Sequence, residues 1–233
     1  MQTDVAPEPS CYSRLVNEWV CKDYLVDRQD ELVTATREHL LITVSAVLLG
    51  LVLAIPLAVL ARRFARLESA VLGVATGLYT VPSLALFPLL VPFTGLTRTT
   101  VVIGLALYSL TILVRNTLEG LRSVPADVVE SATGLGYSRT RLFLRIEFPL
   151  ALPVIMAGLR IATVSTVALT TVGTVVAYGG LGNLLKNGVQ EDFRAQVLAA
   201  SVICVLLAVL LDLLLFAVQR LMTPWARSAR AAA

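Results

Sequence analysis

The chain has 233 residues, of which 57% are hydrophobic and only 15% are charged, and its mean hydropathy is +0.80. Soluble domains carry about 25% charged residues, so this composition indicates a membrane protein and argues against an ordinary soluble domain. The formal charge of +3 says little alone, because in membrane proteins the positions of Lys and Arg along the chain indicate the topology.

The chain begins with a polar segment, residues 1–38, which holds eight acidic and four basic side chains. It lacks the basic-then-apolar order of a cleavable signal peptide, so we expect a tail outside the membrane domain. The tail contains Cys11 and Cys21. A continuous helix would hold them about 15 Å apart, too far for a disulfide. A bridge therefore requires a turn between them, and a disulfide and free thiols are both open at this point.

Five apolar runs are long enough to cross roughly 30 Å of hydrocarbon as helices. They are continuous rather than alternating, which argues against a transmembrane β-barrel. The sequence therefore predicts an all-α membrane protein with spans at 40–61, 69–91, 99–118, 149–178 and 195–219. We expect a transmembrane domain over 39–220 and a carboxyl-terminal tail over 221–233. Pro82, Pro88 and Pro92 predict that the second span is kinked or broken, with the freed backbone groups satisfied by other helices or by a water-filled cavity.

Between the third and fourth spans lies a polar insert, the loop 120–148. Ser123 and Pro125 are helix-start signals, and Gly134 and Gly136 should end that helix. Ser138 can cap a second short helix, and Phe148 before Pro149 indicates the next boundary. From these residues alone, a docking surface for another protein and an ordinary solvated loop are both open.

Three sets of polar or aromatic residues within the spans are candidates for a translocation pathway. Four threonines share one helix face, where they could line the pathway or bond back to their own helix. Aromatic rings could receive a quaternary ammonium or simply pack. An arginine and an aspartate are costly at membrane depth and could form a structural pair or take part in transport. The residues are Thr163, Thr166, Thr170 and Thr174; Tyr79, Phe87 and Tyr108; and Arg160 and Asp212.

The basic residues predict the orientation. With the amino terminus outside, eleven arginines fall on the cytoplasmic side and seven Lys or Arg residues fall outside. The first short cytoplasmic loop, with Arg62, Arg63 and Arg66, weighs most in the positive-inside rule. We therefore expect a multi-pass membrane protein with its amino terminus outside, its carboxyl terminus inside and the insert in the cytoplasm.

The insert resembles the cytoplasmic loop of ABC-importer permeases, whose pattern is E-A-A, three residues, G, nine residues, I-x-L-P. Here Glu130-Ser131-Ala132 precedes Gly136 by three residues, and Ile146-Glu147-Phe148-Pro149 follows nine residues later. The sequence departs from the pattern at Ser131 and Phe148. Segments 80–90, 107–136, 149–160 and 178–185 resemble the osmoprotectant branch of these permeases, which imports glycine betaine, choline and carnitine.

This resemblance implies a subunit of a bacterial importer, located in the cytoplasmic membrane, with a five-helix core of the methionine-permease type. Two permease subunits, identical or homologous, would form the pathway. Two separate ATPase subunits would bind ATP and Mg²⁺, and a separate extracytoplasmic binding protein would deliver the solute. The coupling residues would be Glu130, Ser131, Ala132, Gly136, Arg139 and Arg141. The binding protein would contact loops 92–98 and 179–194, including Gly179, Gly180, Gly182 and Asn183; the alternative is a turn that only closes the bundle.

The sequence gives little support to other functions. It has no phosphate-binding G-x-x-x-x-G-K-[ST] loop, and its single His39 and three separated cysteines give no metal-ligand spacing. We therefore expect no cofactor or metal in this chain, no nucleic-acid partner and no enzyme activity. The remote alternative is an intramembrane enzyme. Another small solute, such as an amino acid or ergothioneine, is the alternative within transporters.

Overall fold

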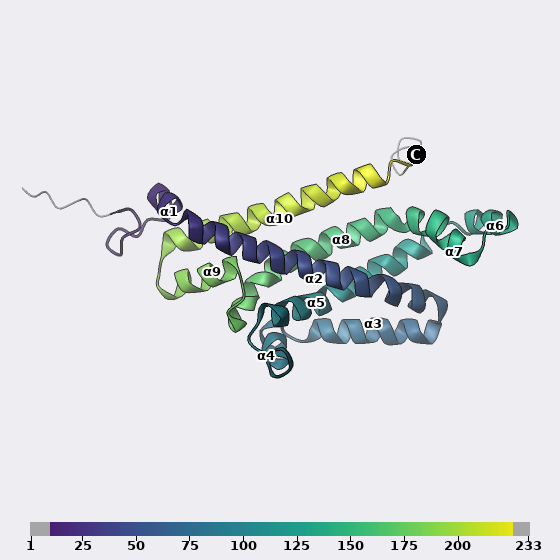
Figure 1. Ribbon diagram of the computed structural model, residues 1–233, viewed down its shortest axis with the longest axis horizontal. Coiled ribbons are helices and arrows are strands. Elements are labelled where there is room, and N and C mark those ends of the chain that lie inside the picture. The colour runs from purple at the N-terminus through teal and green to yellow at the C-terminus, as the bar shows by residue number, and fades with distance from the viewer. Residues whose placement is uncertain (1–9, 226–233) are drawn as a thin grey trace, which may run out of the picture.

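The computed structural model describes residues 10–225, and its regular elements within that range are helices. Figure 1 shows an elongated molecule: α1, α9 and the start of α10 lie at one end, and α6 and α7 lie at the other. In chain order the helices are α1 Lys22–Asp27, α2 Gln29–Arg63, α3 Ala65–Thr80, α4 Ser83–Thr94, α5 Arg98–Arg122, α6 Ala126–Gly134, α7 Arg139–Leu142, η1 Phe143–Glu147, α8 Phe148–Thr170, η2 Thr171–Val176, α9 Leu181–Gln190 and α10 Arg194–Met222. Of the predicted carboxyl-terminal tail, Arg227 and Arg230 lie outside the described residues.

Four helical runs are long and apolar enough to cross a membrane, and the bent pair α3–α4 makes a fifth if it is counted as one span. This matches the five predicted spans. The helix of the first span, α2, is longer than predicted, because it begins at Gln29 rather than near residue 40. Asp30 and Glu31 lie in its first turn, and Arg62 and Arg63 lie in its last turn, where each charge complements the helix dipole. The last part of the predicted tail is therefore the first part of a membrane helix.

The predicted break in the second span is confirmed. The axes of α3 and α4 meet at 103°. Val81, at the junction, is extended because the following Pro82 disfavours helical backbone at the preceding residue. The Tyr108 hydroxyl, on α5, donates a hydrogen bond to the Val81 carbonyl oxygen. A neighbouring helix thus satisfies a carbonyl that the break has freed, as the bilayer requires.

The core lies around α5, which packs against α2 and α8. Small residues bring these helices close together. A Cβ added to Gly50 of α2 would lie 2.1 Å from the Ser109 Oγ on α5. Helix α4 also packs on α5, where a Cβ added to Gly104 of α5 would lie 2.7 Å from the Phe87 ring of α4. Phe87 is fully buried, so the third aromatic residue considered for cation recognition is a packing residue.

The boundary expected at Phe148 is the residue at which α8 begins, but the type of helix changes there without an interruption. Helix runs without interruption from α7 through η1, α8 and η2, over Arg139–Val176. Pro149 lies in the first turn of α8, directly after the π-helical turn η1. A proline ring would clash with the carbonyl four residues back in a regular α-helix, and the wider π turn accommodates it. The run ends at Ala177, which has a left-handed backbone.

Candidate functional site

The insert contains the short helix α6, which ends in a Schellman motif. The Tyr137 amide donates to the Ala132 carbonyl oxygen at 3.2 Å, and the Gly136 amide donates to that of Thr133 at 3.0 Å. Gly136 has φ +83°, which glycine adopts without the steric cost of a side chain. The predicted helix stop at the two glycines is therefore confirmed, with the left-handed turn at the second one.

Five of the expected coupling residues lie at the surface of α6, of the turn after it and of α7. Glu130, Ser131 and Gly136 are exposed, as are Arg139 and Arg141 on α7. No atom lies within 4 Å of a Cβ added to Gly136, so the backbone conformation, rather than crowding within this chain, requires glycine there. Ala132 differs from the others because it is 5% exposed and is covered by its own chain.

Two ion pairs tie down the helices that flank the insert. The Arg62 Nη2 on α2 lies 2.7 Å from the Glu147 Oε1, immediately before α8. The Arg122 Nη2 at the end of α5 lies 2.6 Å from the Glu68 Oε2 on α3. The sequence showed these arginines only as topology signals, because their partners are distant in the chain. Neither pair had a local signal.

The end of α5 and the start of α8, which flank α6 and α7, also pack closely against each other. A Cβ added to Gly120 of α5 would lie 2.9 Å from the carbonyl oxygen of Ala151 on α8. Ala151, Ile155 and Leu121 form a buried cluster here, and Val129 of α6 packs against it. The insert is therefore attached to α5 and α8 through one shared apolar cluster.

Arg160 and Asp212 form a two-pronged ion pair between α8 and α10. The Arg160 Nε lies 2.8 Å from the Asp212 Oδ1, and its Nη2 lies 2.7 Å from Oδ2. The Phe216 ring lies over the guanidinium, 4.8 Å from its centre. The pair lines an open cavity of about 470 Å³ together with Ser165. This geometry supports a structural ion pair, and a role of Arg160 and Asp212 in transport stays a prediction.

The four threonines do not share one environment. Thr163, Thr166 and Thr170 are buried, and each donates its hydroxyl to the carbonyl oxygen four residues earlier. The Thr170 hydroxyl also lies 3.1 Å from that of Thr43 on α2. Thr174 lies in the 3₁₀ segment η2. These contacts favour helix packing for the first three, and their place in a pathway stays a prediction.

The tyrosine pair lies beside the broken span. The rings of Tyr79 and Tyr108 meet edge to face, with centroids 5.8 Å apart. Tyr79 is half exposed, whereas Tyr108 is 5% exposed and its hydroxyl is bonded to Val81. Only the Tyr79 ring therefore offers an accessible face to a cation.

The glycine-rich loop before α9 is packed tightly inside the chain. A Cβ added to Gly180 would lie 2.7 Å from the backbone of His39, and one added to Gly182 would lie 2.2 Å from the Thr171 carbonyl oxygen. Gly179 is also buried, and its amide donates to the Asn183 side chain at 3.2 Å. These contacts support the bundle-closing alternative, and contact between these residues and a binding protein stays a prediction.

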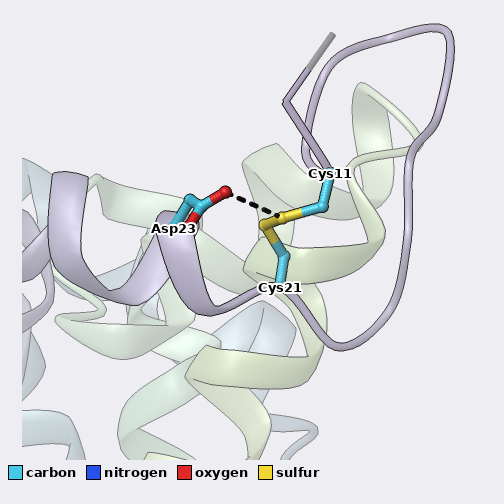
Figure 2. A group of neighbouring side chains, drawn as sticks. All are labelled: Cys11, Cys21 and Asp23. Atoms are coloured by element: carbon cyan, nitrogen blue, oxygen red, sulfur yellow. Dashed lines mark hydrogen bonds between the residues drawn. A yellow bond between two sulfur atoms is a disulfide. The ribbon is translucent and has the colours of Figure 1, made fainter. Parts of the chain in front are cut away.

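The amino-terminal tail contains the disulfide for which a turn was required. Cys11 and Cys21 are joined, with Cα atoms 5.6 Å apart (Figure 2). The Cys11 Sγ lies 3.6 Å from an Asp23 carboxylate oxygen. Since the two sulfurs are bonded to each other, neither is the thiolate that a metal would need. Burial raises the pKa of the nearby Tyr24 hydroxyl to about 12.

The comparisons with known proteins agree on the type of protein. Residues 46–228 match the family described as the binding-protein-dependent transport system inner membrane component. The chain is 39% identical over 207 residues to the osmoprotectant import permease protein OsmW of Salmonella typhimurium, covering 86% of this chain and 96% of that protein. It is 34% identical over 200 residues to the carnitine transport permease protein OpuCB of Listeria monocytogenes, covering 85% and 92%.

A solved structure shows the same fold. The methionine ABC transporter MetNI, in an inward-facing conformation, contains a chain that superposes with a TM-score of 0.76 at 21% sequence identity. The match covers 84% of this chain and 98% of that one. The expected methionine-permease fold is therefore confirmed, and this chain belongs to the family of inner membrane components of binding-protein-dependent ABC transport systems, as a transporter subunit whose ATP is bound by a separate ATPase.

Proposed function

We propose that this chain is the permease subunit of an ATP-driven importer for a small osmoprotectant such as glycine betaine, choline or carnitine. The support is the kinship with OsmW and OpuCB over most of both chains. Import of another small solute, such as an amino acid or ergothioneine, is the competing function. Uptake of labelled glycine betaine, choline, carnitine and amino acids by cells that carry only this importer separates the two.

We propose further that the amino terminus lies outside the cell. The disulfide lies at the end of the molecule that holds α1 and α9, opposite α6 (Figure 1), and disulfides persist in oxidising compartments. The basic loop after α2 falls at the opposite end. Cysteine introduced at Asn187 should react with an impermeant reagent in intact cells, and cysteine introduced at Ser138 should not. The reverse pattern overturns this orientation.

At the outer end, the binding protein would contact α9. Gly179 and Gly180, just before α9, and Gly182, in its first turn, are buried. Lys186 and Asn187, further along α9, are exposed. Exposed residues of α9, rather than the glycines, would then meet the binding protein. Gly179, Gly180, Gly182 and Asn183 would hold that helix in place. If bulky substitutions at 186–187 leave docking and uptake unchanged, this assignment fails.

At the inner end, α6 would insert into a cleft on the ATPase and act as the coupling helix. The observation that carries this proposal is the position of α6 at the tip of the molecule (Figure 1), ended by a left-handed glycine and presenting Glu130 to solvent. Two permeases and two ATPases would form the complete importer. Movement of α6 would reach α5 and α8 through the cluster around Ala151 and the close contact at Gly120.

The test compares two exposed glycines. Gly136→Val forces a β-branched side chain into a left-handed backbone, at a cost of roughly 1–2 kcal/mol, and should abolish solute uptake. Gly134→Val is the matched control, because a Cβ at Gly134 also meets open space but the backbone there is helical. Both variants should insert into the membrane normally, and neither should alter the activity of the isolated ATPase.

The three outcomes are distinguishable. Loss of uptake at position 136 alone assigns the effect to the shape of the turn. Loss at both positions assigns it to collision with the ATPase, and both results support docking. If both variants keep full uptake and full solute-stimulated hydrolysis, the insert is not the coupling element. Failure to import an osmoprotectant, with hydrolysis still stimulated by another solute, would refute only the substrate class.

A further inference from the structure

The loop 10–28, which consists of the disulfide-closed turn Cys11–Cys21 and the short helix α1, lies against the start of α10 and outside the part of the chain that matches the transport family. The disulfide closes the loop, as Figure 2 shows. The Asn17 side chain donates to the Asp192 carbonyl oxygen at 2.6 Å and accepts from the Arg194 amide at 3.1 Å. Tyr24 packs edge to face on Phe193, with ring centroids 5.2 Å apart. These contacts fix the loop at one level of the bundle.

This fixed loop exposes large apolar side chains that its core does not use. Leu15 is 90% exposed and Val20 is 80% exposed, and Trp19, Leu25 and Val26 are about half exposed or more. Of these, Trp19, Val20 and Leu25 line one groove, and a contiguous apolar surface of this kind marks a site that binds a membrane or another protein. The loop therefore presents an apolar surface that is suited to an apolar partner.

A groove beside these residues leads onto the lipid-spanning helix α10. It has a volume of about 240 Å³, and it is lined by Trp19, Val20 and Leu25 of the loop and by Leu198, Val202 and Ile203 of α10. Only 6% of the most apolar stretch of α10 is buried within the chain. The groove is thus continuous with the exposed apolar surface of a membrane span.

The level of the loop relative to the bilayer follows from Trp19. Its ring lies 5.9 Å from the guanidinium of Arg194, which is the first residue of α10. Tryptophan is enriched at the headgroup level of membranes, where its ring is partly apolar and its N–H remains hydrated. Arginine can extend from a helix end to the same level. Trp19 and Arg194 therefore place the apolar edge of the loop at the membrane interface.

We propose that the disulfide-closed loop 10–28 is a membrane-interface anchor, which holds a phospholipid acyl chain in the groove between Trp19, Leu25 and the first turns of α10. The loop carries three basic and three acidic side chains, a net charge of zero: Arg14, Lys22 and Arg28 against Glu18, Asp23 and Asp27. Apolar insertion, rather than attraction to anionic headgroups, therefore supplies the affinity. This anchor is independent of the transported solute and of the orientation of the chain.

The two tryptophans of the chain make a direct test possible. Trp225→Phe leaves Trp19 as the single tryptophan in the full-length protein, which is reconstituted in phosphatidylcholine vesicles. Lipids brominated near the ester end of their chains should quench the Trp19 fluorescence strongly, and aqueous acrylamide should quench it little. Replacing part of the lipid with anionic phosphatidylglycerol should leave the quenching by brominated lipid unchanged.

Two variants on that background sharpen the test. Val20→Asp places a charge at an exposed apolar position and should remove most of the quenching by brominated lipid. Glu18→Gln changes an exposed polar residue of the same loop and should leave it unchanged. Quenching by acrylamide but not by brominated lipid would show that the loop faces solution. Protection of Trp19 from both quenchers would show that a second copy of this chain covers it. Either result overturns the proposal.

Discussion

The two ends of the molecule both depend on glycine, but for opposite reasons. At the α6 end, an added Cβ would meet open space at Gly134 and Gly136, and only the left-handed backbone of Gly136 excludes a side chain. At the α9 end, an added Cβ on Gly180 or Gly182 would lie within 2.7 Å of backbone atoms of His39 or Thr171. Glycine therefore shapes an exposed turn at one end and permits close packing at the other.

The other stabilising contacts follow the same division. The α9 end is held by a disulfide, by a side chain that caps α10 from the tail, and by aromatic rings packed edge to face. The α6 end is held by one apolar cluster and by ion pairs at the helix ends behind it. A rigid end and a projecting end are what an importer needs, if one end receives a binding protein and the other follows the movement of an ATPase.

The largest expected effect breaks the close packing at the α9 end. Gly182→Ala places a Cβ 2.2 Å from the Thr171 carbonyl oxygen, and such overpacking should cost about 3 kcal/mol. Gly77→Ala in α3 is the matched control, because its Cβ would meet no atom within 4 Å. Alanine in a helix interior is favoured by about 1 kcal/mol over glycine. Thermal unfolding in detergent should shift in opposite directions for the two variants, and equal shifts would contradict this account of the loop.

The next effect opens the tail at the same end. Cys11→Ser releases the loop between Cys11 and Cys21, whose closure stabilises the folded tail by roughly 2.5 kcal/mol in the loop-entropy estimate. Trypsin should then cut faster at the exposed Arg14 and Lys22. Cys204→Ser changes the free, half-buried thiol on α10 and should leave the cutting rate unchanged. Equal rates in wild type and Cys11→Ser would mean that the other tail contacts suffice.

A smaller effect is expected at the α6 end. Glu147→Gln removes the charge that faces Arg62, and because Glu147 is 9% exposed the loss should be about 2 kcal/mol. Glu119→Gln also removes a partner of an arginine, but that pair lies at the surface with its charges 3.7 Å apart and should contribute less than about 0.5 kcal/mol. A double-mutant cycle with Arg62→Gln measures the pairwise energy. A coupling energy near zero would show that the pair does not hold α2 to α8.

The features that the sequence predicted are those with a local cause. Continuous apolar runs marked the spans, Pro82 marked the break, and Gly136 marked the end of α6. Each depends on the backbone of a few consecutive residues, so the sequence contains the whole signal.

The features that the sequence did not predict need a partner far along the chain. The Arg62–Glu147 pair joins residues separated by 85 positions, and no spacing rule connects them. The π turn before Pro149 was not predicted, because the sequence analysis expected a boundary at the proline and gave no weight to local widening of a continuous helix. The glycines before α9 were recognised as a turn, but the close approach of α2 and η2 appears only in three dimensions.

The smallest predicted effect concerns Asn17, which joins the tail to α10. Its side chain accepts from the Arg194 amide, the first N–H of α10, at 3.1 Å, and so caps that helix from a position 177 residues away. Loss of a helix cap costs about 1 kcal/mol. Asn17 also has φ +44°, which asparagine tolerates better than alanine does.

Two substitutions separate the cap from the backbone. Asn17→Gly removes the side chain and keeps the left-handed conformation free of strain, so it should cost only the cap. Asn17→Ala should cost more, because it adds the strain of a left-handed alanine, roughly 1–2 kcal/mol. Amide hydrogen exchange in the first turns of α10 should rise in both variants and stay unchanged in Asn187→Ala, an exposed control on α9. If exchange in α10 does not rise in Asn17→Gly, water replaces the cap, and the tail is held by its disulfide and its aromatic rings alone.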